Sequence, residues 1–79
     1  EENVEIINSL AINFLNSNDF ENLEAHIEKY INNHHSHILY YLKGFVLLQD
    51  DKIYESENFF KKSMRILKSE FVILFSIRG

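Results

Sequence analysis

The fold is decided by residues 40–64, which read YYLKGFVLLQDDKIYESENFFKKSM. An apolar segment over residues 40–49 and an amphipathic segment over residues 53–64 are separated by the polar residues 50–52. Apolar side chains recur at three- and four-residue spacing in both segments, which is typical of helices. The first segment carries Gly44 in its middle, and the second carries Ser56 and Ser63 where it would meet its neighbour. This stretch predicts an antiparallel helical hairpin whose two helices approach closely.

The rest of the chain follows the same pattern. Apolar residues at helical spacing predict helices over residues 4–15, 20–31, 38–48 and 53–67, and residues 71–79 begin a further one. Polar clusters at residues 16–19, 32–36 and 49–52 mark the turns, because the chain has no proline and only two glycines. We therefore expect an all-α protein of about five helices, arranged as antiparallel hairpins.

The composition narrows the class of protein. A chain of 79 residues fits a single small domain, here residues 1–79. Its net charge of -4, with scattered basic residues, argues against nucleic acid, and the absence of cysteine excludes thiolate chemistry. No apolar run approaches the roughly 18 residues of a membrane span, and the acidic N-terminus is unlike a secretory signal. We expect a cytoplasmic protein and, since no initiator methionine is present, a fragment of a longer chain.

Small residues recur at a nearly constant interval along the sequence. Ala11, Gly44 and Gly79 each follow a bulky apolar residue by four positions, and they are separated by 33 and 35 residues. The turn repeats as well, since residues 18–20 correspond to residues 51–53. A small side chain at such a position lets paired helices approach closely. The sequence therefore predicts two helical hairpins of similar build and the start of a third.

A helix–turn–helix unit with a period near ~34 residues resembles the tetratricopeptide repeat family. The family's pattern falls on Tyr40, Lys43, Gly44, Leu47, Ser56, Phe60 and Ser63, although Lys43 stands where the family has leucine. The resemblance implies a right-handed α-solenoid of stacked hairpins. Repeat one would cover about residues 4–36, repeat two about 37–70, and a partial repeat three residues 71–79. The residues expected in contacts within and between repeats are Ala11, Gly44, Ser56, Phe60 and Ser63.

In this family the first helices of successive hairpins line a concave groove that holds a partner. The groove residues implied for this chain are Asn8, Ile12, Ile38, Tyr41, Phe45, Leu48 and Gln49. Such an apolar and aromatic surface suits an amphipathic helix or an extended peptide. It lacks the Lys and Arg residues that clamp a C-terminal carboxylate in some family members. The resemblance thus implies a protein–protein interaction module that binds a protein or peptide partner.

A second interpretation stays open beside it. The same aromatic residues would pack against a further helix if the chain is a structural segment of a longer helical-repeat protein, such as a secretion chaperone or a peptide-sensing regulator. The apolar residues 71–77 have no polar cap, and an open apolar end of this kind would drive self-association. The two interpretations carry equal weight at the level of sequence.

His34, His35 and His37 form the chemically most suggestive cluster in the chain. Three imidazoles within four residues are a candidate zinc or nickel site, with His26 approaching from the preceding helix. A solvated loop between repeats explains the cluster more simply, because no cysteine lies nearby and a turn fixes no ligand geometry. No nucleophile elbow, carboxylate pair or phosphate-binding glycine loop is present. We therefore expect neither a cofactor nor catalysis.

Overall fold

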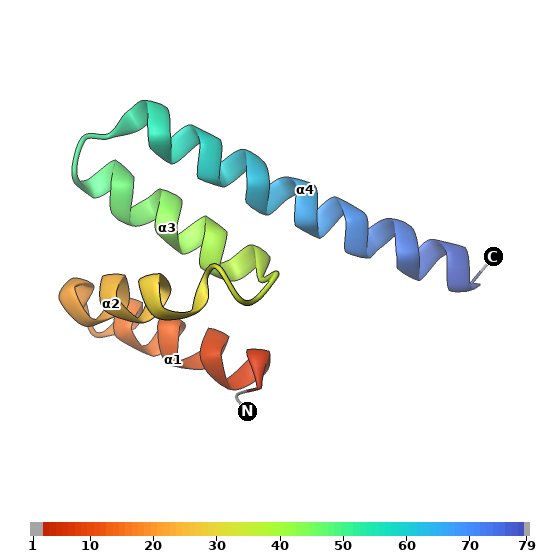
Figure 1. The fold of residues 1–79 in the computed structure, drawn as a ribbon, viewed down its shortest axis with the longest axis horizontal. Coiled ribbons are helices and arrows are strands. Elements are labelled where there is room, and N and C mark those ends of the chain that lie inside the picture. The colour runs from red at the N-terminus through yellow and green to blue at the C-terminus, as the bar shows by residue number, and fades with distance from the viewer. Residues whose placement is uncertain (1–2, 79) are drawn as a thin grey trace.

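The computed structural model of the chain describes residues 3–78, with side chains described as far as Val72. Within this range it contains four helices and no strand: α1 (Val4–Asn16), α2 (Phe20–Tyr30), α3 (His37–Gln49) and α4 (Ile53–Arg78). Figure 1 shows that α1 and α2 form one antiparallel hairpin and that α3 and α4 form a second, with α3 lying against the first. The expected all-α class is confirmed.

The expectation of five helices was wrong, because α4 continues for 26 residues without a break. The interruption expected between residues 67 and 71 is absent, and residues 71–78 extend α4 rather than starting a new helix. Residues 61–70 contain no glycine or proline and are rich in Lys, Arg, Leu, Met and Glu, which are strong helix formers. Since α3 has only 13 residues, the C-terminal part of α4 projects beyond it (Figure 1). Gly79 lies outside the described residues.

The two hairpins close with the same turn. Asn18 and Asp51 both have left-handed backbone conformations, with φ of 58° and 61°. The N–H of Asn18 donates to the Leu15 carbonyl and that of Asp19 to the Phe14 carbonyl, at 3.0 and 2.9 Å. Thirty-three residues later, Asp51 and Lys52 repeat these bonds to Leu48 and Leu47, at 3.1 and 2.9 Å. Both turns are Schellman motifs, with Asn or Asp in place of the usual glycine. The turn of the first hairpin therefore recurs in the second at this offset.

One apolar core joins the first three helices. It forms because residues at three- and four-residue spacing place one face of each helix inward, and each fully buried Leu or Ile contributes about 1.5–3 kcal/mol. Phe14, Leu15, Tyr30, Ile38, Tyr40 and Phe59 pack around this core. Its buried members are Ile7, Ala11, Leu23, Ile27, Ile31, Leu39, Leu42 and Val46.

Polar contacts fix how the helices of this core sit on one another. His26 Nε2 lies 2.8 Å from the Ile7 carbonyl oxygen and so joins α2 to α1. Ser36 Oγ donates to Asn8 Oδ1 at 2.7 Å, and Ser36 Oγ itself accepts the Leu39 N–H as the N-cap of α3. Lys43 Nζ lies 2.7 Å from Glu28 Oε1, which joins α3 to α2. The α1–α2 hairpin thus holds α3 through apolar packing, the Ser36–Asn8 hydrogen bond and the Lys43–Glu28 ion pair.

Candidate functional site

Aromatic rings form a row that crosses three helices. Phe20, at the start of α2, lies 6.2 Å from Phe45 on α3, measured between ring centroids. Tyr41 is one helical turn before Phe45 and lies 5.3 Å from Phe60 on α4. Aromatic pairs at these separations contribute about 0.5–1.5 kcal/mol beyond the area they bury. We call Phe20, Phe45, Tyr41 and Phe60 the aromatic row; its two ring contacts link α3 to α2 and to α4.

The predicted groove residues of α3 occupy one side of that helix. Tyr41 is 54% exposed and Leu48 44% exposed, whereas Phe45 and Ile38 are half-buried. Gln49 is exposed at the end of the helix. Tyr41, Phe45 and Leu48 follow the i, i+4, i+7 spacing of a helical stripe, so they form a continuous apolar surface. This surface is partly occupied, since Phe45 already packs on Phe20.

The predicted groove residues of α1 divide between two environments. Ile12 is exposed, whereas Asn8 is half-buried and accepts the hydrogen bond from Ser36. Asn8 was expected to line the partner groove, but its side-chain carbonyl oxygen already has an intramolecular donor. Spacing along the helix gave no sign of this contact, because Ser36 is 28 residues away in sequence.

The residues expected in repeat packing lie where α3 meets α4 and where α1 meets α2. Ala11 is buried in the apolar core that joins the first three helices. A Cβ atom at Gly44 would lie 2.7 Å from Phe60 Cε1 and 3.1 Å from the Ser56 carbonyl oxygen, so the hairpin leaves no room for a side chain there. Ser56 and Ser63 are buried on the same face of α4, and Ser63 Oγ donates to the His37 carbonyl at 2.7 Å.

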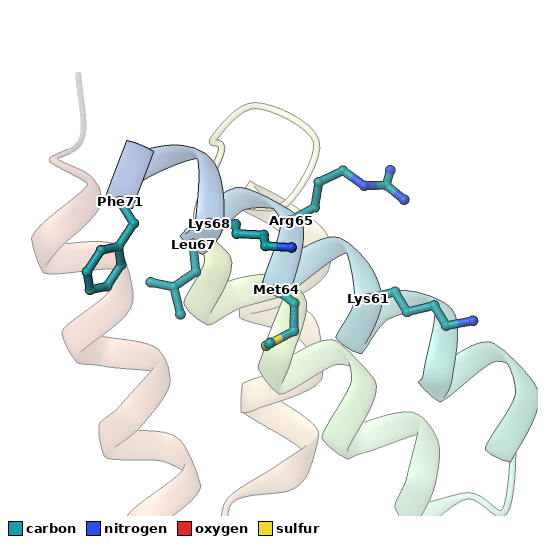
Figure 2. Close-up of a pocket in the computed structure, with 6 residues that line it drawn as sticks. All are labelled: Lys61, Met64, Arg65, Leu67, Lys68 and Phe71. Atoms are coloured by element: carbon teal, nitrogen blue, oxygen red, sulfur yellow. The ribbon is translucent and has the colours of Figure 1, made fainter. Parts of the chain in front are cut away.

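Sequence reasoning missed a groove along α4. Figure 2 shows Met64, Leu67 and Phe71 projecting from the same side of the helix, at the spacing of successive turns. Lys61, Arg65 and Lys68 complete the lining, so it contains three cations and no carboxylate. We call these six residues the basic groove. Outside the lining, Glu57 Oε1 lies 3.8 Å from Lys61 Nζ in an exposed pair. The groove was missed because the predicted helix break at residues 68–70 divided it.

The histidines of the predicted metal cluster face different neighbours. The His34 ring lies 5.9 Å from the Tyr30 ring, and His37 Nδ1 lies 3.3 Å from Glu70 Oε1. His35 lines a surface depression beside Arg65 and Glu70, and His26 is engaged by the Ile7 carbonyl. Among residues 3–78, no three side chains of ligand type converge on one point. The structure therefore does not bring the predicted ligands together.

The chain matches no protein-family model, no curated protein and no solved structure. No helix within the described range combines the length and the apolarity that a membrane-spanning segment requires. The fold and the two surfaces described above are therefore the basis for assigning a function.

Proposed function

We propose that this chain is a helical-hairpin interaction module, similar to a tetratricopeptide repeat, that binds a segment of another protein on the exposed side of α3. It acts by holding its partner and has no catalytic step of its own. The observation that carries the proposal is the apolar surface of Tyr41, Phe45 and Leu48, of which Tyr41 and Leu48 remain substantially exposed.

The residue types on this surface support binding. Aromatic side chains anchor protein interfaces because they bury a large area for few rotatable bonds. Tyr41 rests against Phe60, so its ring is partly ordered before a partner arrives and loses less entropy on binding. The aromatic row adds ring contacts from α3 to α2 and to α4, so the surface is more than a single exposed side chain.

A direct test compares two double variants of the full chain. Peptides are first selected from a displayed library of random sequences for binding to the wild-type chain. Their affinities are then measured by fluorescence anisotropy on Tyr41→Ala/Leu48→Ala and on the matched control Ile6→Ala/Leu10→Ala. Ile6 and Leu10 are also exposed apolar residues, but they lie on α1, outside the core cluster.

We expect the Tyr41/Leu48 variant to lose at least about tenfold in affinity, since truncation of an interface anchor costs more than ~1 kcal/mol. The control variant retains wild-type affinity, and both keep the helical circular dichroism of the wild type. Equal affinities of the two variants, or a selection that yields no binder, would refute the proposal. Phe45 is left intact because its contact with Phe20 makes it partly structural.

The second candidate, a structural segment of a longer helical-repeat protein, is supported by the exposed apolar residues Ile53, Met64 and Phe71 on α4. Under that function these residues pack against a further helix of the same polypeptide. Sedimentation velocity of the 79-residue chain and of a C-terminally extended version distinguishes the binding function from the structural role. Self-association of the chain that the extension abolishes would favour the structural role.

A further inference from the structure

The molecule contains its own example of how a hairpin of this kind holds a helix. The α1–α2 hairpin holds α3 through the contact of the Phe20 and Phe45 rings and the hydrogen bond from Ser36 to Asn8. It also shares an apolar core with α3, to which Ile27 of α2 and Ile31, the residue after α2, contribute. Ile27 and Ile31 are buried in the core, and Leu15 packs against it. The Glu28–Lys43 ion pair adds a charged contact at the edge. The face that α3 covers is therefore defined by residues on both helices of the first hairpin.

The second hairpin repeats this face at the 33-residue offset that its turn also shows. Asn8 and Leu15 correspond to Tyr41 and Leu48 on α3. Phe20, Ile27 and Ile31 correspond to Ile53, Phe60 and Met64 on α4. We call Tyr41, Leu48, Ile53, Phe60 and Met64 the docking face. The docking face is at least as apolar as its counterpart, since Tyr41 replaces an asparagine.

Burial distinguishes the two faces. Ile31 is 7% exposed beneath α3, whereas its counterpart Met64 is 65% exposed. Leu15 is half-buried, whereas its counterpart Leu48 is exposed, and Phe20 is 38% exposed against 66% for its counterpart Ile53. The docking face is thus exposed at every residue except Phe60, which is half-buried against Tyr41. Leu67 and Phe71 extend it along α4 for two further turns (Figure 2).

Charge specifies what kind of helix fits. The position that corresponds to Glu28 is Lys61, so the sign of the edge contact is reversed. Arg65 and Lys68 continue the positive charge along the basic groove. A helix that lies on the docking face as α3 lies on α1 and α2 therefore needs an acidic residue where α3 has Lys43. In a second copy of this chain, α1 would offer Leu10 at that position, which leaves Lys61 without a partner.

We propose that the docking face binds an amphipathic helix of a partner protein, with an acidic residue opposite Lys61, in the manner in which the first hairpin binds α3. The inference rests on the proposed function and specifies its partner. The apolar side of the partner helix packs on Tyr41, Ile53 and Met64, and its acidic flank lies along Lys61, Arg65 and Lys68.

The test reverses the charge of Lys61 in the full chain and the charge of residue 43 in a helical peptide, separately and together. The probe is a synthetic peptide of residues 36–50 with Lys43→Glu, and the matched control is the same peptide with Lys43 retained; both carry an identical uncharged polar tail. Each peptide is titrated by fluorescence anisotropy against the wild-type chain and against Lys61→Glu. Lys61 is exposed, so its substitution leaves the fold intact.

We expect the Glu peptide to bind the wild-type chain about fivefold more tightly than the Lys peptide, the scale of one partly exposed ion pair. The preference reverses on Lys61→Glu. The proposal would be overturned if the wild-type chain and Lys61→Glu preferred the same peptide. If both preferred the Lys peptide, the peptide would be replacing α3 on the first hairpin and pairing with Glu28. The absence of saturable binding by either peptide would also overturn it.

Failure of this inference is distinguishable from failure of the proposed function. If library-selected peptides still require Tyr41 and Leu48 but bind Lys61→Glu as tightly as wild type, the binding function stands and the acidic helix is rejected. Dimerisation of the chain at micromolar concentration in sedimentation velocity would assign the face to a second copy and overturn the proposal. Binding to vesicles of anionic phospholipid that Lys61→Glu abolishes would assign it to a membrane surface, with the same consequence.

Discussion

Substitution of Gly44 by alanine tests the close approach of α3 and α4. In an ordinary helix position, Gly→Ala stabilises a protein by about 1 kcal/mol through helix propensity. At Gly44 the new Cβ would lie 2.7 Å from Phe60 Cε1, 2.8 Å from Phe60 Cδ1 and 3.1 Å from the Ser56 carbonyl oxygen. All three distances are shorter than a normal van der Waals contact, and one of the three atoms belongs to the backbone. The ring and α4 must therefore move.

The magnitude follows from these two opposing effects. Overpacking of this kind costs about 1–3 kcal/mol, so after the gain in helix propensity we expect a net loss of about 1 kcal/mol. The assay is urea denaturation followed by circular dichroism at the helix band, with ΔG of unfolding obtained by linear extrapolation. Ala25→Gly, at an exposed position in α2, serves as the control and reports the propensity effect without a packing change.

The Phe60→Leu background provides the decisive comparison. Leucine removes the ring atoms nearest to the new Cβ, so Gly44→Ala should there be less destabilising by about 1 kcal/mol or more than in the wild type. Because the two residues are in contact, their effects should not add. If Gly44→Ala stabilises the wild-type chain by as much as Ala25→Gly destabilises it, Gly44 faces open space and the packing of the hairpin is wrong.

Two further predictions concern buried polar groups. Ser56 Oγ is buried without a hydrogen-bond partner in the described range, so Ser56→Ala should stabilise the chain by about 1 kcal/mol. Ser63→Ala should instead destabilise it by about 1 kcal/mol, because it removes the hydrogen bond to the His37 carbonyl. Urea denaturation of both variants checks this, and shifts of the same sign would contradict it. His26→Phe should keep the ring contacts with Phe14 and Tyr30 but lose the bond to the Ile7 carbonyl, at a cost of about 1 kcal/mol in the same assay; an unchanged stability would show that this bond contributes nothing.

Sequence reasoning was most successful where local pattern decides the structure. The spacing of apolar residues located α1, α2, α3 and the start of α4, since their hydrophobic stripes are local features. The correspondence of residues 18–20 and 51–53 predicted two similar turns, and the structure shows the same bonds in both. Gly44 was singled out for its size, and it lies against Phe60.

The sequence was less informative about helix continuity and about contacts between residues that are far apart in the chain. A break was expected at residues 68–70, but they are helical because no glycine or proline interrupts the strong helix formers around them. The basic groove became apparent only once α4 was continuous, since its residues lie on both sides of the expected break. Asn8 and His26 form hydrogen bonds with residues 28 and 19 positions away in the sequence, and no local pattern indicates such contacts.

The most direct test of the uncovered docking face uses the one methionine of the chain, Met64. A ¹³C label on its methyl group gives a resonance at the centre of that face, which is followed by NMR while the Lys43→Glu peptide is added to the full chain. We predict a saturable shift of this resonance that is lost in Tyr41→Ala/Leu48→Ala and retained in Ile6→Ala/Leu10→Ala. Binding of the peptide with the Met64 methyl resonance unmoved would show that a helix docks elsewhere on the molecule.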